Sequence, residues 1–276
     1  MTNVAKMIKY LAMGFAIFLT VSIISMICYG VMLLGNIVDS DNSYEEDTNY
    51  ENTVEITKAK ISEKLDISVK RTNIIIKQGD KFSVGTNNKY IKSRMDKDTL
   101  YIYEEDHSML DRYSGDLYIF IPNDYRFKDI DIDNGAGKVE INGLKTEDLS
   151  LELGAGKVRL EDIEVYSEME VNGGAGAMEI VKATVNDMDL DMGAGKVTFS
   201  GYLRGENKIN AGVGALVVNL SDDEYTVSID KGIGSATYNG EEMYDDGIYG
   251  TGRNKILLDG GIGSIKITTQ KIVSVS

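Results

Sequence analysis

A short phrase of glycine, any residue and glycine recurs seven times between residues 135 and 263 of this 276-residue chain. From one phrase to the next, the first glycines are 19, 20, 19, 19, 20 and 29 residues apart. Such a period is typical of folds in which repeats stack, because one repeat cannot bury its own apolar face. The glycines are Gly135, Gly137, Gly154, Gly156, Gly174, Gly176, Gly193, Gly195, Gly212, Gly214, Gly232, Gly234, Gly261 and Gly263.

The residues around each phrase alternate between apolar and polar. The third residue before the phrase and the second and fourth residues after it are apolar in the repeats. This period of two predicts two short strands per repeat, with the apolar side chains turned inward. One inward position departs from the pattern, because Asn207 stands where an aliphatic residue is expected. The other repeats have Ile130, Leu149, Met169, Met188, Val227 and Ile256 at this position.

The glycine phrase predicts a corner between the two strands and not a phosphate-binding loop. A Walker loop needs a glycine five residues before its Gly-Lys pair, where this chain has Ile132, Leu151 and Leu190. No repeat supplies the third glycine of a dinucleotide fingerprint, and no helix is expected after any phrase. At a corner, glycine permits a positive φ and lets neighbouring backbones approach closely.

An uncharged apolar run from Tyr10 to Val38 predicts a membrane anchor. Its 29 residues exceed the roughly 20 that span a bilayer and the ~7–15 of a signal peptide's apolar region. A removed signal is the alternative, although Ile27 before Cys28 does not suit a lipoprotein signal. Lys6 and Lys9 precede the run and acidic residues follow it. We therefore expect a single-pass cell-membrane protein with a cytoplasmic N-terminus and an extracellular C-terminal domain.

The predicted fold class is all-β, a β-solenoid-like stack of seven two-strand repeats preceded by one transmembrane helix. The expected organisation is a cytoplasmic tail and anchor at 1–38, an acidic spacer at 39–52, an N-terminal β cap of hairpins at 53–128 and the repeat stack at 129–276. In this interpretation the last repeat ends the stack, and Lys266 and Lys271 help to blunt its exposed edge.

The charge of the chain limits its partners. The part after Val38 holds all 44 acidic residues and 27 of the 29 basic ones, an excess of 17 negative charges. Nucleic acid is excluded as a partner, and only the anchor is expected to contact lipid. Cationic peptides, cationic envelope polymers or metal ions suit such a surface better, although simple solubility also explains it. The single cysteine, Cys28, lies in the apolar run, so the outer domain has no disulfide.

Neither catalytic, cofactor-binding nor metal-ligating residues are predicted. An outward column of acids and amides two residues before each phrase could bind calcium weakly, but a structural ladder is the preferred interpretation. The lone histidine, His107, stands in the segment "EEDHSML" and is expected to be a loop residue. Outward carboxylates could supply a glycosidase pair, yet nothing singles out one pair. The column is Asp133, Glu152, Asn172, Asp191, Asn210, Asp230 and Asp259.

The insertion Asn239–Asn254, which lengthens the last step, is the candidate binding patch. Carboxylates beside aromatic rings suit a cationic peptide or an amine-bearing polymer. A passive surface loop is the alternative, and the sequence alone suggests that the insertion could be shortened with the fold intact. The candidate residues are Tyr238, Glu241, Glu242, Tyr244, Asp245, Asp246 and Tyr249.

The anchor, the segment "GDLYIFIPND" and repeats such as "LELGAGKVRL" resemble the bacterial putative-adhesin family of β-strand-repeat proteins, also called toast-rack. The resemblance covers about residues 66–269 and implies a β stack displayed at the cell envelope. This family is a domain of unknown function and offers no catalytic motif. Some members are encoded beside envelope-stress regulators or small membrane signalling proteins. We therefore expect a non-catalytic binding or sensing module, with an adhesin or structural spacer as the alternative and a carbohydrate-active enzyme third.

Overall fold

The computed structural model describes residues 54–55, 62–106 and 114–270, and every regular element among them is a strand. The predicted all-β fold is thus confirmed for this part of the chain. No helix long and apolar enough to cross a membrane occurs within it. The expected anchor Tyr10–Val38, the acidic spacer at 39–52, His107 and Lys271 lie outside the described residues.

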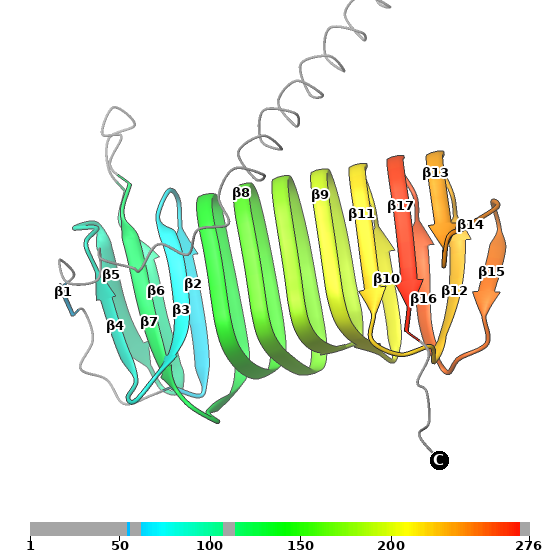
Figure 1. The fold of residues 1–276 in the computed structure, drawn as a ribbon. Coiled ribbons are helices and arrows are strands. Elements are labelled where there is room, and N and C mark those ends of the chain that lie inside the picture. The colour runs from blue at the N-terminus through cyan, green and yellow to red at the C-terminus, as the bar shows by residue number, and fades with distance from the viewer. Residues whose placement is uncertain (1–53, 56–61, 107–113, 271–276) are drawn as a thin grey trace, which may run out of the picture. The chain divides into compact units, whose positions relative to one another are not determined.

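The strands form a two-sided stack of rungs whose tight glycine corners lie along the upper edge in Figure 1. They are β1 (Val54–Glu55), β2 (Lys64–Val69), β3 (Asn73–Gly79), β4 (Ser83–Thr86), β5 (Ile91–Asp96), β6 (Thr99–Glu104), β7 (Asp116–Pro122), β8 (Arg126–Asn186), β9 (Met188–Arg204), β10 (Glu206–Asn210), β11 (Val213–Leu220), β12 (Tyr225–Asp230), β13 (Ile233–Tyr238), β14 (Glu241–Glu242), β15 (Gly247–Gly250), β16 (Asn254–Asp259) and β17 (Ile262–Thr269). Within β8 and β9 the extended backbone continues through the corners.

Neighbouring rungs pair in parallel and one repeat apart, so that equivalent residues lie side by side. Val213 pairs with Ala194, and Gly214 pairs with Gly195. This register places each apolar column in the interior, and its side chains are 8% exposed or less. The three columns predicted from the period of two are therefore inward, with Tyr238 half-buried as the exception. Parallel pairing with apolar residues at every second position makes one continuous core along the stack.

The rungs near the C-terminus do not stack in the order of the sequence. β16 and β17, which form the last rung of the chain, lie between the rung of β10 and β11 and the rung of β12 and β13. Lys266 accordingly pairs with Val217 on one side and Thr237 on the other. The expectation that the last repeat ends the stack, with Lys266 at an exposed edge, was wrong. Residues 239–253 give the chain enough length to pass over the outermost rung and return inside it.

The N-terminal segment also contains a rung that does not stack in the order of the sequence. β2 and β3 lie between the rung of β6 and β7 and the first rung of β8, in parallel with both. Only β1, β4 and β5 pair in antiparallel fashion there. The expected cap of hairpins therefore consists of two further rungs, which lack the glycine phrase, covered by short antiparallel strands.

Two buried polar side chains, Asn207 and Glu104, satisfy backbone groups at places where the repeat pattern is broken. Asn207 is fully buried, and its side chain accepts a hydrogen bond from the Met188 N–H and donates to the carbonyl oxygens of Arg204 and Lys255, each at 3.1 Å. Asn207 therefore satisfies three backbone groups where β9 gives way to β10. At the corner between β2 and β3, which has no glycine, Glu104 accepts hydrogen bonds from the backbone N–H groups of Lys70 and Arg71 at 2.8 and 3.3 Å.

Candidate binding surface at the C-terminal end of the stack

The insertion that breaks the repeat forms a cap over the outermost rung. β14 pairs with β13 in antiparallel fashion, and β15 pairs with β12 in the same way. The two-residue turn Asn239-Gly240 joins β13 to β14, with φ angles of 52° and 86°. Asn-Gly with two positive φ angles is the preferred sequence of a tight β-hairpin turn. This signal was present in the sequence and would have identified the hairpin.

The inner side of the cap closes the end of the hydrophobic core. Met243 is fully buried, and its N–H donates a 2.8 Å hydrogen bond to the carbonyl oxygen of Ala236. The rings of Tyr238 and Tyr249, both half-buried, lie 6.0 Å apart between centroids. Removing the insertion would expose this end of the core to water. The expectation that the insertion could be shortened without effect on the fold therefore conflicts with the packing.

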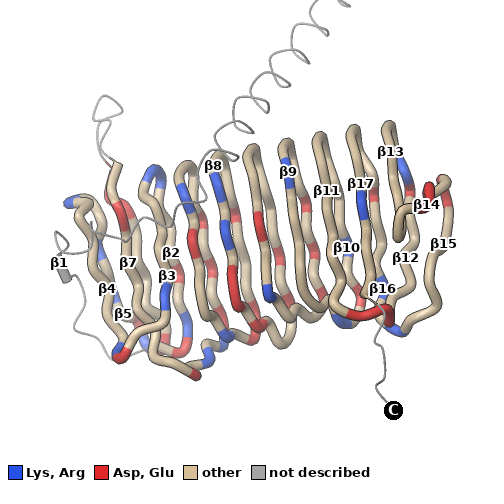
Figure 2. Tube along the Cα trace, in the orientation of Figure 1, with Lys and Arg blue, Asp and Glu red and all other residues tan. Residues whose placement is uncertain are grey.

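The outer side of the cap carries the candidate carboxylates. Glu241, Glu242, Asp245 and Asp246 are all exposed, and Figure 2 shows acidic positions at this end of the chain trace. Lys231 lies beside them, because its Nζ is 3.4 Å from Glu242 Oε1 and its backbone N–H donates to Asp245 Oδ1 at 2.9 Å. Glu242 is the one carboxylate of the four with an ion pair within the described residues. Lys231 thus brings Glu242 and Asp245 together, and Glu241 and Asp246 are their exposed neighbours in the sequence.

The three candidate tyrosines have different surroundings. The ring of Tyr244 is 68% exposed, whereas Tyr238 and Tyr249 pack against the core. The hydroxyl of Tyr249 accepts a 2.6 Å hydrogen bond from the Tyr244 N–H, which holds the turn between β14 and β15. Tyr244 is therefore the one tyrosine of the three that is fully available to a partner.

Exposed apolar side chains gather at the same end of the stack, and Tyr244 is the one of them that is also a candidate from the sequence. Among the described residues, the most exposed large hydrophobic side chains are Ile233 (72%), Ile248 (70%), Tyr244 (68%), Ile262 (54%) and Leu257 (45%). Every other such side chain in the described ranges is 40% exposed or less. A large exposed apolar patch commonly marks an interaction site.

Part of this patch comes from the residue between the two glycines of the phrase. That residue is alanine in the first four phrases, then valine and isoleucine. Val213 pairs with Ile262, and Ile262 pairs with Ile233, so these three side chains form a row at the corner edge. The row is uncharged in Figure 2, over β11, β17 and β13. The change from Ala to Val and Ile was the sequence signal that could have found it.

The outward acidic column forms a ladder along the stack, but its order differs from the sequence. Asp259 lies between Asn210 and Asp230, so Asp259 and Asp230 are direct neighbours. Within the described residues, no group of three or more His, Cys, Asp or Glu side chains has the arrangement to hold a metal ion. The ladder is therefore left without an assigned ligand.

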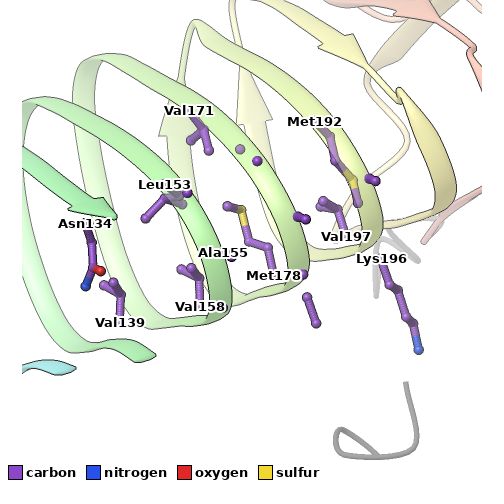
Figure 3. Close-up of a pocket in the computed structure, with 18 of the residues that line it drawn as sticks. Asn134, Val139, Leu153, Ala155, Val158, Val171, Met178, Met192, Lys196 and Val197 are labelled. Carbon is purple, nitrogen blue, oxygen red and sulfur yellow. The ribbon is translucent and has the colours of Figure 1, made fainter. Parts of the chain in front are cut away.

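A cavity of about 40 Å³ lies beneath the glycine corners of β8 and β9 (Figure 3). Gly173 has no side chain at the position that Leu153 and Met192 occupy in adjacent repeats, which leaves room there. Most of the side chains around it are apolar, including Val139, Val158, Met178 and Val197. A small apolar cavity of this kind is a packing feature and not a ligand site.

One family model and several solved structures match this chain. The family model "Toastrack DUF4097" matches residues 47–243, more than half of the chain. A "putative cell adhesion protein" from Clostridium sporogenes ATCC 15579 is 17% identical, with 79% of this chain and 100% of that chain covered and a TM-score of 0.32. A "putative adhesin (BF0245)" from Bacteroides fragilis NCTC 9343 is 16% identical, with coverages of 78% and 95% and a TM-score of 0.32. No match was found among curated proteins.

Proposed function

Because the chain belongs to the Toastrack DUF4097 family, whose function is unknown, we propose a role from the geometry of its own surface. We propose that it is a membrane-anchored, extracellular, non-catalytic module that binds or senses cationic molecules at the cell envelope through the C-terminal cap. A cationic peptide or an amine-bearing envelope polymer is the ligand, and a membrane signalling protein is the partner that relays binding.

The observation that carries this proposal is the coincidence of two kinds of surface at the cap. Tyr244 and Ile248, two of the most exposed apolar side chains of the described residues, flank Asp245 and Asp246 in the chain. Ile233, the most exposed one, lies two residues after Lys231, whose N–H donates to Asp245. Apolar area contributes affinity, while carboxylates attract a cation and orient it. Tyr244 offers an exposed aromatic ring among these carboxylates, which suits an ammonium or guanidinium group.

An adhesin or structural spacer is the second candidate. The observation that favours it is the regular parallel register of the rungs, which keeps equivalent residues side by side along the stack. A spacer of this kind needs no ligand at the cap. The two functions therefore differ in whether the cap binds a soluble cationic probe.

Binding of a labelled peptide distinguishes them. The probe is a fluorescein-labelled heptapeptide of four lysines and three valines, added to the full chain in a nonionic detergent at low salt. Replacing two cap carboxylates, Glu241→Gln with Asp246→Asn, should weaken binding several-fold, since an exposed ion pair contributes about 0.2–1 kcal/mol. The control is Asp133→Asn with Glu152→Gln, which removes the same charge from the outward ladder. An unchanged affinity in the cap variant, or equal losses in both variants, would contradict the proposal.

A further inference from the structure

The outermost strand of the cap has one uncovered edge. Among the described strands, β15 pairs only with β12, from Thr226 opposite Gly250 to Ile229 opposite Gly247. The backbone N–H and C=O groups on the other edge of an outer strand are free to pair with another extended chain. Figure 1 shows β15 as the last strand at this end of the stack.

The edge of β5, at the opposite end of the stack, is protected by charged side chains. β5 carries Lys92 and Arg94 on its edge, and charged side chains discourage a second strand from pairing there. Lys92 lies 3.7 Å from Glu105, and the guanidinium of Arg94 lies over the ring of Tyr101. β15 consists of Gly247, Ile248, Tyr249 and Gly250 and so has neither a charge nor a proline. The edge at the C-terminal end is therefore left open to pairing.

The side chains next to this edge favour a strand with apolar residues. Ser228 on β12 lies between two apolar residues of the neighbouring strands. It pairs with Ile248 on β15 and with Leu257 on β16. Ile248 and Leu257 are 70% and 45% exposed, so two apolar side chains flank Ser228 on the outer face near the edge. An added strand would place every second side chain on this face, against Ile248.

The charges at the start of β15 favour a basic strand. Asp245 and Asp246 immediately precede the strand, and Glu241 lies on the hairpin that closes the same end. Within the described residues none of these three forms an ion pair with a lysine or arginine side chain. A second copy paired through the same edge would bring like charges together, which disfavours self-association relative to a basic partner.

We propose that the open edge of β15 accepts an extended peptide with alternating apolar and basic side chains, which adds to the sheet as one further strand. This inference rests on the proposed function and names its ligand and its mode of binding. Main-chain hydrogen bonds to β15 provide affinity, Ile248 contacts the apolar side chains, and the carboxylates around the hairpin contact the basic ones. Because β15 has four residues, the contact is short.

Peptides that differ in the order of their residues or in their backbone test whether the ligand adds to β15 as a strand. Three peptides of four lysines and three valines are compared on the full chain in a nonionic detergent. In the first the two residues alternate, in the second their order is scrambled, and in the third the alternating sequence is N-methylated at every second residue. We expect the alternating peptide to bind at least tenfold more tightly than the other two. Equal binding of all three would overturn strand addition while leaving cationic binding by the cap intact, whereas binding of none would overturn the proposed function itself.

Substitution at the edge provides the matching test on the protein. Ile248→Ser should weaken the alternating peptide several-fold without a change in thermal stability, since Ile248 is mostly exposed. The control is Met95→Ser on β5, the edge strand at the other end, which should leave binding unchanged. Equal effects of the two substitutions would contradict the assignment to β15. A dimer that Ile248→Ser dissociates would also overturn it, because the occupant of the edge would then be a second copy.

Discussion

At the scale of single residues, a Cβ has no room at either glycine of a repeat corner such as Gly174 and Gly176, and the second glycine also has a positive φ. The second, as in Gly176, has a φ of +149°, which L side chains rarely adopt. The first, as in Gly174, is fixed by space, because a Cβ there would lie 2.0 Å from the carbonyl oxygen of Gly154 in the next rung. Close stacking of successive corners thus requires glycine even where the backbone conformation does not.

Gly173 and Gly174 are adjacent in the chain and should respond oppositely to alanine. A Cβ on Gly173 would have its nearest neighbour at 3.4 Å, an ordinary contact beside the cavity. Gly173→Ala should therefore raise the free energy of unfolding by about 0.4–1 kcal/mol, chiefly by restricting the unfolded chain. Gly174→Ala should lower it by about 3 kcal/mol, because backbone must move. Denaturant unfolding followed by circular dichroism measures both, and equal effects would refute the role given to the corner.

At the scale of elements, the parallel register places like charges on adjacent rungs. Asp131 on β8 lies beside Asp66 on β2. Partial burial, and then the negative charges of Asp66, Asp129, Glu152 and Asp133, raise the pKa of the Asp131 carboxyl. Partial burial and the charge of Asp129 raise the pKa of Asp66 as well. This part of the sheet is therefore less stable when its carboxylates are ionised.

Asp131→Asn should stabilise the protein in a pH-dependent way. Because the pKa is raised in the folded state, ionised Asp131 destabilises the fold above that pKa, and the penalty disappears as pH falls below the unfolded value of 3.8. The variant should thus be more stable than the original chain at pH 7 and equal to it below about pH 3.5. Thermal unfolding between pH 3 and pH 8 measures the difference. Asp80→Asn, in the turn between β3 and β4, controls for the substitution, and a constant gain at every pH would contradict the explanation.

At the scale of the whole molecule, both ends of the stack are built by the same device. At each end, the first or last rung in the sequence (β2 and β3, or β16 and β17) is not the outermost rung of the stack. The rung next to it in the sequence (β6 and β7, or β12 and β13) is outermost and is covered by short antiparallel strands. An outer parallel rung would otherwise leave long open edges. At the C-terminal end the cover is incomplete, and this leaves the edge of β15 for the proposed ligand.

Engineered disulfides test the order of the rungs directly. Lys208 pairs with Leu257, whereas Ser228 is the next rung beyond Leu257. In a chain with Cys28→Ser, the pair Lys208→Cys with Leu257→Cys should form a disulfide, because adjacent strands are about 4.8 Å apart. Lys208→Cys with Ser228→Cys should not, since two rungs separate them by about 10 Å. The reverse result on a non-reducing gel would show that the rungs stack in the order of the sequence.

The sequence by itself determined the repeat, its two strands, the inward columns and the glycine corners, because each depends on local periodicity and on the space around one residue. It also contained two further signals, the Asn239-Gly240 turn of the hairpin and the change from Ala to Val and Ile at the corner. The surface that each of them helps to form became clear only when the neighbouring strands were placed. Only the tertiary structure decided that β16 and β17 lie inside β12 and β13, that Met243 closes the core, and that Asn207 serves three backbone groups. The physical reason is that every rung presents nearly the same apolar pattern and register to either neighbour. Local pattern therefore cannot choose which rungs meet, and the choice falls to the length of the connections and to the way the two ends are covered.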